Sequence, residues 1–200
     1  MRIGIYGGTF DPPHIGHINA CKAFCEQIQL DKLYVIPAYL PPHKELSSFV
    51  SATTRLKMCE LAFSDISEKI IVSDLEIKRK GRSYTADTIK SFIDEDDDNE
   101  IFLLCGTDML LTLDTWYKPN YIFSHSNIVH VKRDVELCDM VSEAITRYQK
   151  KFGANIIELK IDIIEISSTE IRNAISSGAT KLNLLTDEVF DFIKLNRLYV

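Results

Sequence analysis

The residues best suited to chemistry lie in one short stretch, from Gly7 to His17, which reads GGTFDPPHIGH. The adjacent glycines follow a short apolar segment, residues 3–6, and predict a sharp turn whose backbone N–H groups face one point. A helix beginning near Ile18 would add unpaired N–H groups and the positive end of its dipole, and both favour an anion. Two histidines, His14 and His17, stand at the start of that helix, where an imidazole can donate to a phosphate oxygen. The stretch therefore predicts a phosphate-binding loop.

Directed hydrogen bonds, more than the helix dipole, would give this loop its affinity. The dipole supplies only about 0.3 to 1 kcal/mol, whereas a hydrogen bond to a charged oxygen supplies roughly 1.5 to 3 kcal/mol. The alternative is an ordinary strand-to-helix turn, stiffened by Pro12 and Pro13, in which the histidines have no ligand. The combination of glycines, a preceding strand, a following helix and an H-x-G-H pair favours the phosphate-binding interpretation.

Length, charge and cysteine content predict a single domain and argue against several classes of protein. The chain has 200 residues with 46% hydrophobic content, which predicts a single domain over residues 1–200. A net charge of -6 argues against a nucleic-acid-binding surface. Five cysteines without a C-x-x-C pair predict reduced, packed thiols rather than zinc ligands. No apolar stretch approaches ~18 residues and no leader pattern precedes Gly7, so we expect a cytoplasmic protein without a membrane span.

Strand and helix patterns alternate along the rest of the chain. Apolar runs predict strands at 33–36, 70–72, 101–104, 128–131 and 156–161. Helical periodicity predicts helices at 18–30 and 86–93 and a further helix that ends at Gly153. Capping residues predict that four more helices begin at Ser51, Thr107, Ser167 and Thr186. Loops are expected at 37–50 and 74–85, and the acidic run 94–100 is expected to be a solvated turn rather than a calcium loop.

This alternation predicts an α/β fold, a doubly wound parallel sheet with helices on both faces and a small C-terminal helical portion at about 167–200. Ligands of such sheets bind beyond the carboxyl ends of the strands, near a switch in strand order. Four chemically promising segments each follow a predicted strand, so the fold should gather them at one edge. They are Gly7-Gly8, Gly106-Thr107-Asp108, Lys132-Arg133 and 167–172.

The chemistry expected at that edge is phosphoryl or nucleotidyl transfer. The sequence has neither a Walker phosphate loop nor a dinucleotide G-x-G-x-x-G fingerprint, and no convincing nucleophile with a paired base. Many phosphate donors without a covalent catalyst are typical of reactions that depend on positioning and charge stabilisation. A Mg²⁺ ion carried by the nucleotide phosphates is expected, with no protein ligands assigned.

The first loop resembles the GGTFDPPHxGH signature of bacterial nicotinate-nucleotide adenylyltransferases, of the H-x-G-H nucleotidyltransferase superfamily. Further blocks resemble the same family in the same order: 41–44, 73–85, 106–108, 115–117 and 166–172. The resemblance implies a Rossmann-like fold and the conversion of ATP and nicotinic acid mononucleotide into deamido-NAD and pyrophosphate. Lys132 stands where a proline is common and residues 134–160 match poorly, which leaves the role of Arg133 open.

The resemblance also implies roles for individual residues. Catalytic roles fall to His14, His17 and Arg172. ATP would be bound by Gly8, Thr9, Phe10, His14, His17, Gly106, Asp108, Ser168, Thr169 and Arg172. Nicotinic acid mononucleotide would be bound by Lys44, Thr85, Trp116 and Tyr117. The alternatives are another small-molecule adenylyl- or cytidylyltransferase of the superfamily and a non-catalytic nucleotide sensor. A class I aminoacyl-tRNA synthetase is disfavoured because no K-M-S-K-S segment is present, and a homo-oligomer is left open.

Overall fold

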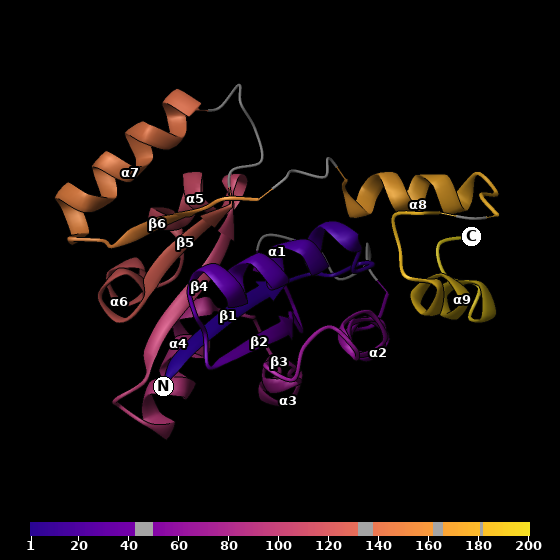
Figure 1. Ribbon diagram of the computed structural model, residues 1–200, viewed down its shortest axis with the longest axis horizontal. Helices are drawn as coiled ribbons and strands as arrows, with labels where there is room; N and C mark the ends of the chain where they lie inside the picture. Colours follow the sequence, from indigo (N-terminus) through magenta and orange to yellow (C-terminus); the bar gives the residue numbers. More distant parts are fainter. Residues whose placement is uncertain (43–49, 132–137, 162–165, 181) are drawn as a thin grey trace.

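The computed structural model describes residues 1–42, 50–131, 138–161, 166–180 and 182–200. Within these ranges a parallel sheet of six strands runs through the molecule in the order β3-β2-β1-β4-β5-β6 (Figure 1). The strands are β1 (Arg2–Gly8), β2 (Lys32–Pro37), β3 (Ile70–Val72), β4 (Glu100–Gly106), β5 (Asn127–Val131) and β6 (Ile156–Leu159). The order reverses between β1 and β4, so the predicted doubly wound α/β fold is confirmed and the ligand edge is expected there.

Helices pack on both faces of this sheet. They are α1 (Ile15–Gln27), α2 (Ala52–Phe63), α3 (Leu75–Arg79), α4 (Thr85–Glu95), α5 (Thr107–Thr112), the 3-10 helix η2 (Leu113–Thr115), α6 (Pro119–His125), α7 (Cys138–Phe152), α8 (Ser168–Ser176) and α9 (Asp187–Leu195). Strand β4 shows why two layers form, because its side chains alternate between two buried clusters. Phe102 and Leu104 join the cluster formed with α1, α2, α8 and α9. Leu103 and Cys105 join the cluster formed with α4 to α7.

Several local predictions are confirmed at the residues that end or begin helices. The Ser51 hydroxyl accepts a hydrogen bond from the Thr54 N–H, and Thr186 caps α9 in the same way. Ser167 and Glu170 form the predicted capping box of α8. Gly153 follows α7 with a φ of 64°, in the left-handed region that suits glycine after a helix.

Other local predictions are wrong, and each error concerns a short element. The predicted turn at Gly7-Gly8 is strand, because β1 pairs with β2 as far as Gly8, and the left-handed residue is Phe10, with a φ of 50°. The polar stretch 74–85 contains α3, and α6 lies where no helix was predicted. Thr107 is the first residue of α5 rather than its cap, which is Gly106. The last strand ends at Leu159 instead of 161.

Candidate functional site

A cleft of about 610 Å³ opens at the carboxyl ends of β1 and β4, where the strand order reverses. One wall comes from the end of β1 and the segment after it, together with the start of α5. The other wall comes from Pro41 and Pro42, from the segment before α4, and from the segment after η2. Segments that are far apart in the sequence therefore meet where this topology is expected to bind ligands.

Most of the predicted site residues line this cleft. They are Gly8, Thr9, Phe10, His17, Gly106, Asp108, Ser168, Thr85, Trp116 and Tyr117. The part of the lining that the structure describes does not include His14, Thr169 or Arg172. His14 contacts the lining residue His17, Arg172 contacts Asp11 in the first loop, and Thr169 contacts Arg172. Lys44 and Arg133 lie outside the described residues.

The histidine pair is held at the first turn of α1. The His14 N–H donates to His17 Nδ1 at 3.1 Å, and the two rings stack with centroids 3.6 Å apart. A neutral imidazole whose Nδ1 accepts a hydrogen bond carries its proton on Nε2, so the backbone sets the His17 tautomer. The Phe10 ring packs edge-on against His17 at 5.0 Å and limits rotation of the imidazole. His17 thus lines the cleft as a preorganised Nε2–H donor, while His14 is 3% exposed.

The N-terminal end of α8 docks onto the first loop. Arg172 Nη1 donates to the Asp11 carbonyl oxygen at 2.8 Å, and Nη2 donates to Thr169 Oγ1 at 3.1 Å. The Ser168 hydroxyl donates to the Pro12 carbonyl oxygen at 2.9 Å. These contacts bring residues about 160 positions apart to one loop and hold a half-buried cation beside it.

Asp11, in the middle of that loop, is also held by a residue near the C-terminus, Tyr199. Its carboxylate is 2% exposed, and Oδ1 accepts a hydrogen bond from the Tyr199 hydroxyl at 2.6 Å. Burial, reinforced by this hydrogen bond and the nearby negative charge, raises the pKa of Tyr199 far above its ordinary value. The phenol is therefore a permanent donor, and it fixes the Asp11 side chain behind the cleft.

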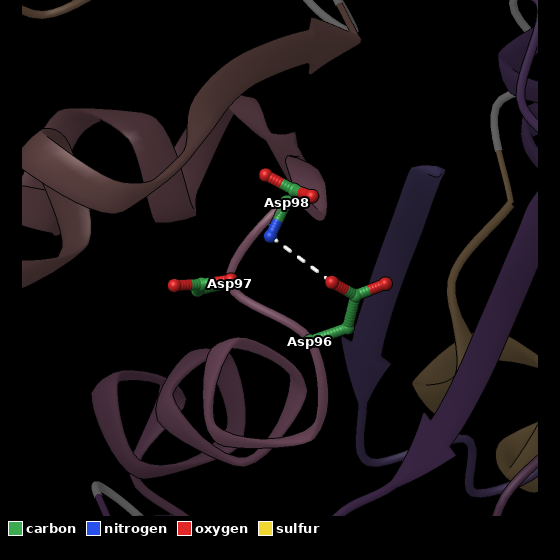
Figure 2. A group of neighbouring side chains, drawn as sticks. All are labelled: Asp96, Asp97 and Asp98. Atoms are coloured by element: carbon green, nitrogen blue, oxygen red, sulfur yellow. Dashed lines mark hydrogen bonds between the residues drawn. The ribbon is translucent and has the colours of Figure 1, made fainter.

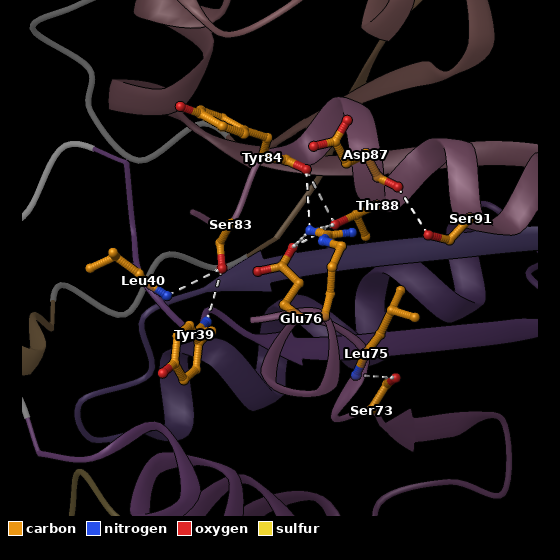
Figure 3. Close-up of polar contacts among 11 residues, drawn as sticks. Tyr39, Leu40, Ser73, Leu75, Glu76, Ser83, Tyr84, Asp87, Thr88 and Ser91 are labelled. Carbon is orange, nitrogen blue, oxygen red and sulfur yellow. Dashed lines mark hydrogen bonds and ion pairs between the residues drawn. The ribbon is translucent and has the colours of Figure 1, made fainter. Parts of the chain in front are cut away.

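The opposite wall is tied together by polar contacts before and within α4 (Figure 3). Ser83 Oγ accepts hydrogen bonds from the N–H groups of Tyr39 at 2.9 Å and Leu40 at 3.4 Å. Thr88 Oγ1 donates to the buried Glu76 carboxylate at 2.6 Å and accepts from Arg79 Nη2 at 3.0 Å. These contacts order the segment from which α4 begins, so the first residues of that helix face the cleft in a defined orientation.

The aromatic part of this wall consists of three rings. Trp116 is half-buried, and its indole N–H donates to Thr112 Oγ1 at 3.3 Å. Tyr117 packs against Tyr84 with ring centroids 4.4 Å apart. Trp116, Tyr117 and Tyr84 all line the cleft, which suits a planar ligand that stacks.

Two charged residues in this region were missed by sequence reasoning. Arg82, which belongs to the predicted loop at 74–85 and received no role there, lines the cleft and donates to the Pro42 carbonyl oxygen at 2.9 Å. Arg55 is 1% exposed and donates to backbone carbonyls of three segments. A signal for Arg55 did exist, because it shares the helical face of Met58, Cys59 and Ala62, all of which are buried.

Neither metal-binding nor thiol chemistry is indicated in the described residues. Their one group of three potential metal ligands is Asp96, Asp97 and Asp98, an exposed turn in which the Asp98 N–H donates to Asp96 Oδ1 (Figure 2). This turn precedes β4 and so lies at the amino end of the strand, away from the cleft. Burial raises the pKa of Cys25 to about 11 and that of Cys105 to about 12, so both thiols stay neutral near pH 7. None of the described helices has the length and apolar character needed to cross a membrane.

Comparisons with known proteins agree with this geometry. The Cytidylyltransferase-like family model matches residues 5–174. A protein of Shewanella woodyi is 35% identical, covering 100% of this chain and 99% of its own, and one of Clostridium acetobutylicum is 37% identical, covering 98% of each. Both are named "Probable nicotinate-nucleotide adenylyltransferase".

Solved structures give the same fold at lower identity. Plasmodium falciparum nicotinic acid mononucleotide adenylyltransferase complexed with NaAD superposes with a TM-score of 0.77 at 19% identity, covering 99% of this chain and 97% of that one. Its complex with APC gives the same TM-score and identity, covering 99% and 96%. From the family model and the full-length relatives, the chain belongs to the nicotinate-nucleotide adenylyltransferase family.

Proposed function

We propose that this protein transfers the adenylyl group of ATP to nicotinic acid mononucleotide, giving deamido-NAD and pyrophosphate. The observation that carries the proposal is that one cleft combines the two glycines and His17 of the first loop with an aromatic wall at a helix N-terminus. Two ligands joined through phosphate would fill the two ends of such a cleft. The full-length relatives are named for this reaction, which supports the choice of substrates.

The ATP end of the cleft is assigned to the β1–α1 loop, the start of α5 and the start of α8. The phosphates would lie against Gly8, Thr9, Phe10 and the donors of His14, His17, Ser168, Thr169 and Arg172, and the adenosine against Gly106 and Asp108. The His17 Nε2–H and the Arg172 guanidinium are the charge-stabilising donors. Both are held in place by protein contacts before the ligand arrives, so little reorganisation is needed during reaction.

The chemical step needs orientation more than acid–base catalysis. A phosphate oxygen of the mononucleotide attacks the α-phosphorus of ATP, and the bond from that phosphorus to the bridging β-oxygen breaks. Pyrophosphate leaves with the electron pair, and no proton has to be removed from the attacking phosphate oxygen. Negative charge grows on the departing phosphates, where His17 and Arg172 would stabilise it.

A Mg²⁺ ion carried by the ATP phosphates fits this cleft. Of the described lining residues only Glu76 and Asp108 are carboxylates, and Glu76 is already engaged by Thr88. Magnesium keeps several water ligands and is commonly bound through substrate phosphates rather than by a cage of protein groups. When bound, the ion would neutralise triphosphate charge.

The mononucleotide end is assigned to Thr85, Trp116, Tyr117 and Lys44, of which the structure describes the first three. Thr85 is the first residue of α4, whose initial backbone N–H groups have no partner within the helix. A nicotinate carboxylate can accept from such donors, whereas a nicotinamide would present its own NH₂ donors to them. The enzyme should therefore prefer the acid form of the mononucleotide.

Replacing Trp116 by alanine is expected to raise the KM for nicotinic acid mononucleotide and to leave the KM for ATP nearly unchanged. Aromatic stacking contributes roughly 0.5 to 1.5 kcal/mol beyond area burial, which corresponds to about a two- to tenfold change. Initial-rate kinetics with each substrate varied in turn measures the effect. Unchanged mononucleotide kinetics, or an equal rise in both KM values, would remove Trp116 from the pyridine site.

The proposed function itself is tested by pyrophosphate release. The wild-type protein should release pyrophosphate only when ATP, Mg²⁺ and a pyridine mononucleotide are all present, and it should do so faster with nicotinic acid mononucleotide than with nicotinamide mononucleotide. Release with pantetheine phosphate, or with CTP in place of ATP, would identify one of the other transferases of the superfamily. Binding of ATP without release would identify a sensor.

A further inference from the structure

Arg55 of α2 is a fully buried cation that contacts two segments whose residues line the cleft. Its Nη1 donates to the Thr9 carbonyl oxygen at 2.7 Å, and its Nη2 donates to the Ala38 carbonyl oxygen at 2.6 Å. Further contacts reach Tyr39 O at 3.4 Å and Val50 O at 3.2 Å. A single guanidinium therefore holds the segment after β1, the segment after β2 and the residue just before the α2 cap.

The segments held by Arg55 are the ones from which the cleft is built. Thr9 lines the cleft on the side assigned to ATP. Ala38, which follows the end of β2, lines the cleft as well. The chain after Ala38 is also held by Ser83, whose Oγ accepts a hydrogen bond from the Tyr39 N–H (Figure 3). Thr9, Arg55, Ala38-Tyr39 and Ser83 thus form a continuous link between the ATP side and the mononucleotide side.

Stability alone does not account for a cation at this place. Burial lowers the pKa of Arg55, and nearby Asp11 counteracts that shift, which shows that the charge is held against a desolvation cost. Buried charges are often replaceable by apolar side chains of similar volume without loss of stability. What an apolar side chain cannot do is donate to four carbonyl groups from three segments at once, and the planar guanidinium fork can.

We propose that Arg55 is a positioning residue for adenylyl transfer, which fixes the phosphate-binding segment at Thr9 relative to the Ala38–Tyr39 segment. The inference rests on the proposed function. Arg55 acts through the backbone of these two segments, so its loss should alter the relative placement of both substrates. Misplacing reacting groups by about 1 Å costs on the order of 100-fold in rate.

The test compares Arg55→Ala with wild type in the pyrophosphate assay, at a temperature well below both melting points. We expect kcat/KM to fall about 100-fold for ATP and for the mononucleotide alike. Low millimolar guanidinium should restore a large part of that loss in Arg55→Ala, saturably, and should leave the wild-type rate unchanged. Arg55→Lys keeps the charge but not the fork, and it should also be impaired and should not respond to guanidinium.

The matched control is Ala62→Gly, a buried position on the same helix. It should destabilise the protein by roughly 1 kcal/mol while leaving kcat/KM at the wild-type value below the melting point. If Arg55→Ala is insoluble, the same kcat/KM measurement is made on Arg55→Lys instead. Wild-type kcat/KM in folded Arg55→Ala or Arg55→Lys, or impairment that guanidinium does not relieve in Arg55→Ala, would overturn the inference. An inactive wild-type protein would instead refute the proposed function.

Discussion

Replacing His17 by alanine is expected to lower kcat about 100- to 1,000-fold while the protein stays folded. The reason is that removal of one preorganised donor to transition-state charge costs about 2.7 to 4 kcal/mol. The structure supports this size of effect, because the His14 N–H fixes the His17 tautomer and the Phe10 ring limits its rotation. Steady-state kinetics with circular dichroism as a folding check measures the change.

Two near-isosteric variants separate the two nitrogens of His17. Glutamine can place an N–H near the position of Nε2, whereas asparagine reaches only the region of Nδ1. If the Nε2–H donor is what matters, His17→Gln should retain more activity than His17→Asn. Asn19→Ala, an exposed change on the same helix, should behave like wild type. Near-normal turnover in His17→Ala, or the reverse order of the two amide variants, would contradict the assigned role.

Replacing Arg172 by alanine is expected to raise the KM for ATP and lower kcat/KM for ATP by roughly tenfold to a hundredfold, with a smaller effect on the mononucleotide. A hydrogen bond to a charged group contributes about 1.5 to 3 kcal/mol, and an arginine has five N–H donors. The structure shows contacts of two of its nitrogens, to Asp11 O and Thr169 Oγ1, and the fork has further donors for a triphosphate.

Arg172 also touches the first loop, so its variants must separate ligand contact from loop support. Arg172→Lys keeps a positive charge near the phosphates but loses the two-nitrogen contact, and it should recover part of the ATP affinity. Asn173→Ala, an exposed neighbour on α8, serves as the control. Isothermal titration with a non-hydrolysable ATP analogue measures the affinity directly. Equal losses of affinity for ATP analogue and mononucleotide would assign Arg172 to the loop rather than to the triphosphate.

The apolar strands were predictable from the sequence, and the short helices α3 and α6 were not. The runs at Ile101 to Leu104 and Ile128 to Val131 are buried on both faces of the sheet. Each therefore appears in the sequence as a continuous run of mostly apolar residues, which predicts a strand. Helices α3 and α6 span 5 and 7 residues, too few turns for a 3.6-residue period to be visible. The glycine pair was misread because pairing with β2 extends β1 to Gly8, and the turn falls on Phe10.

In the candidate site, the contiguous motif was predictable from the sequence, and the contacts between residues distant in the sequence were not. The motif around His14 and His17 is contiguous, so the hypothesis of a phosphate-binding loop could be formed from its residues and their spacing alone. The residues that hold that motif in place could not, because their partners are distant in sequence. Tyr199 reaches Asp11 across 188 positions and Arg55 reaches Thr9 across 46, and no period or motif encodes such a pairing.

The most direct test of the central claim, that one cleft joins ATP to nicotinic acid mononucleotide, follows a labelled phosphorus through the reaction. The wild-type protein is incubated with Mg²⁺, the mononucleotide and ATP radiolabelled at either the α- or the γ-phosphorus, the products are separated by chromatography, and the radioactivity of each product is counted. We expect the α-label to appear in deamido-NAD and the γ-label in pyrophosphate. Transfer of the γ-label to the mononucleotide would contradict the claim that ATP and the mononucleotide are joined by adenylyl transfer. Release of the α-label as free AMP, without formation of a dinucleotide, would contradict it as well.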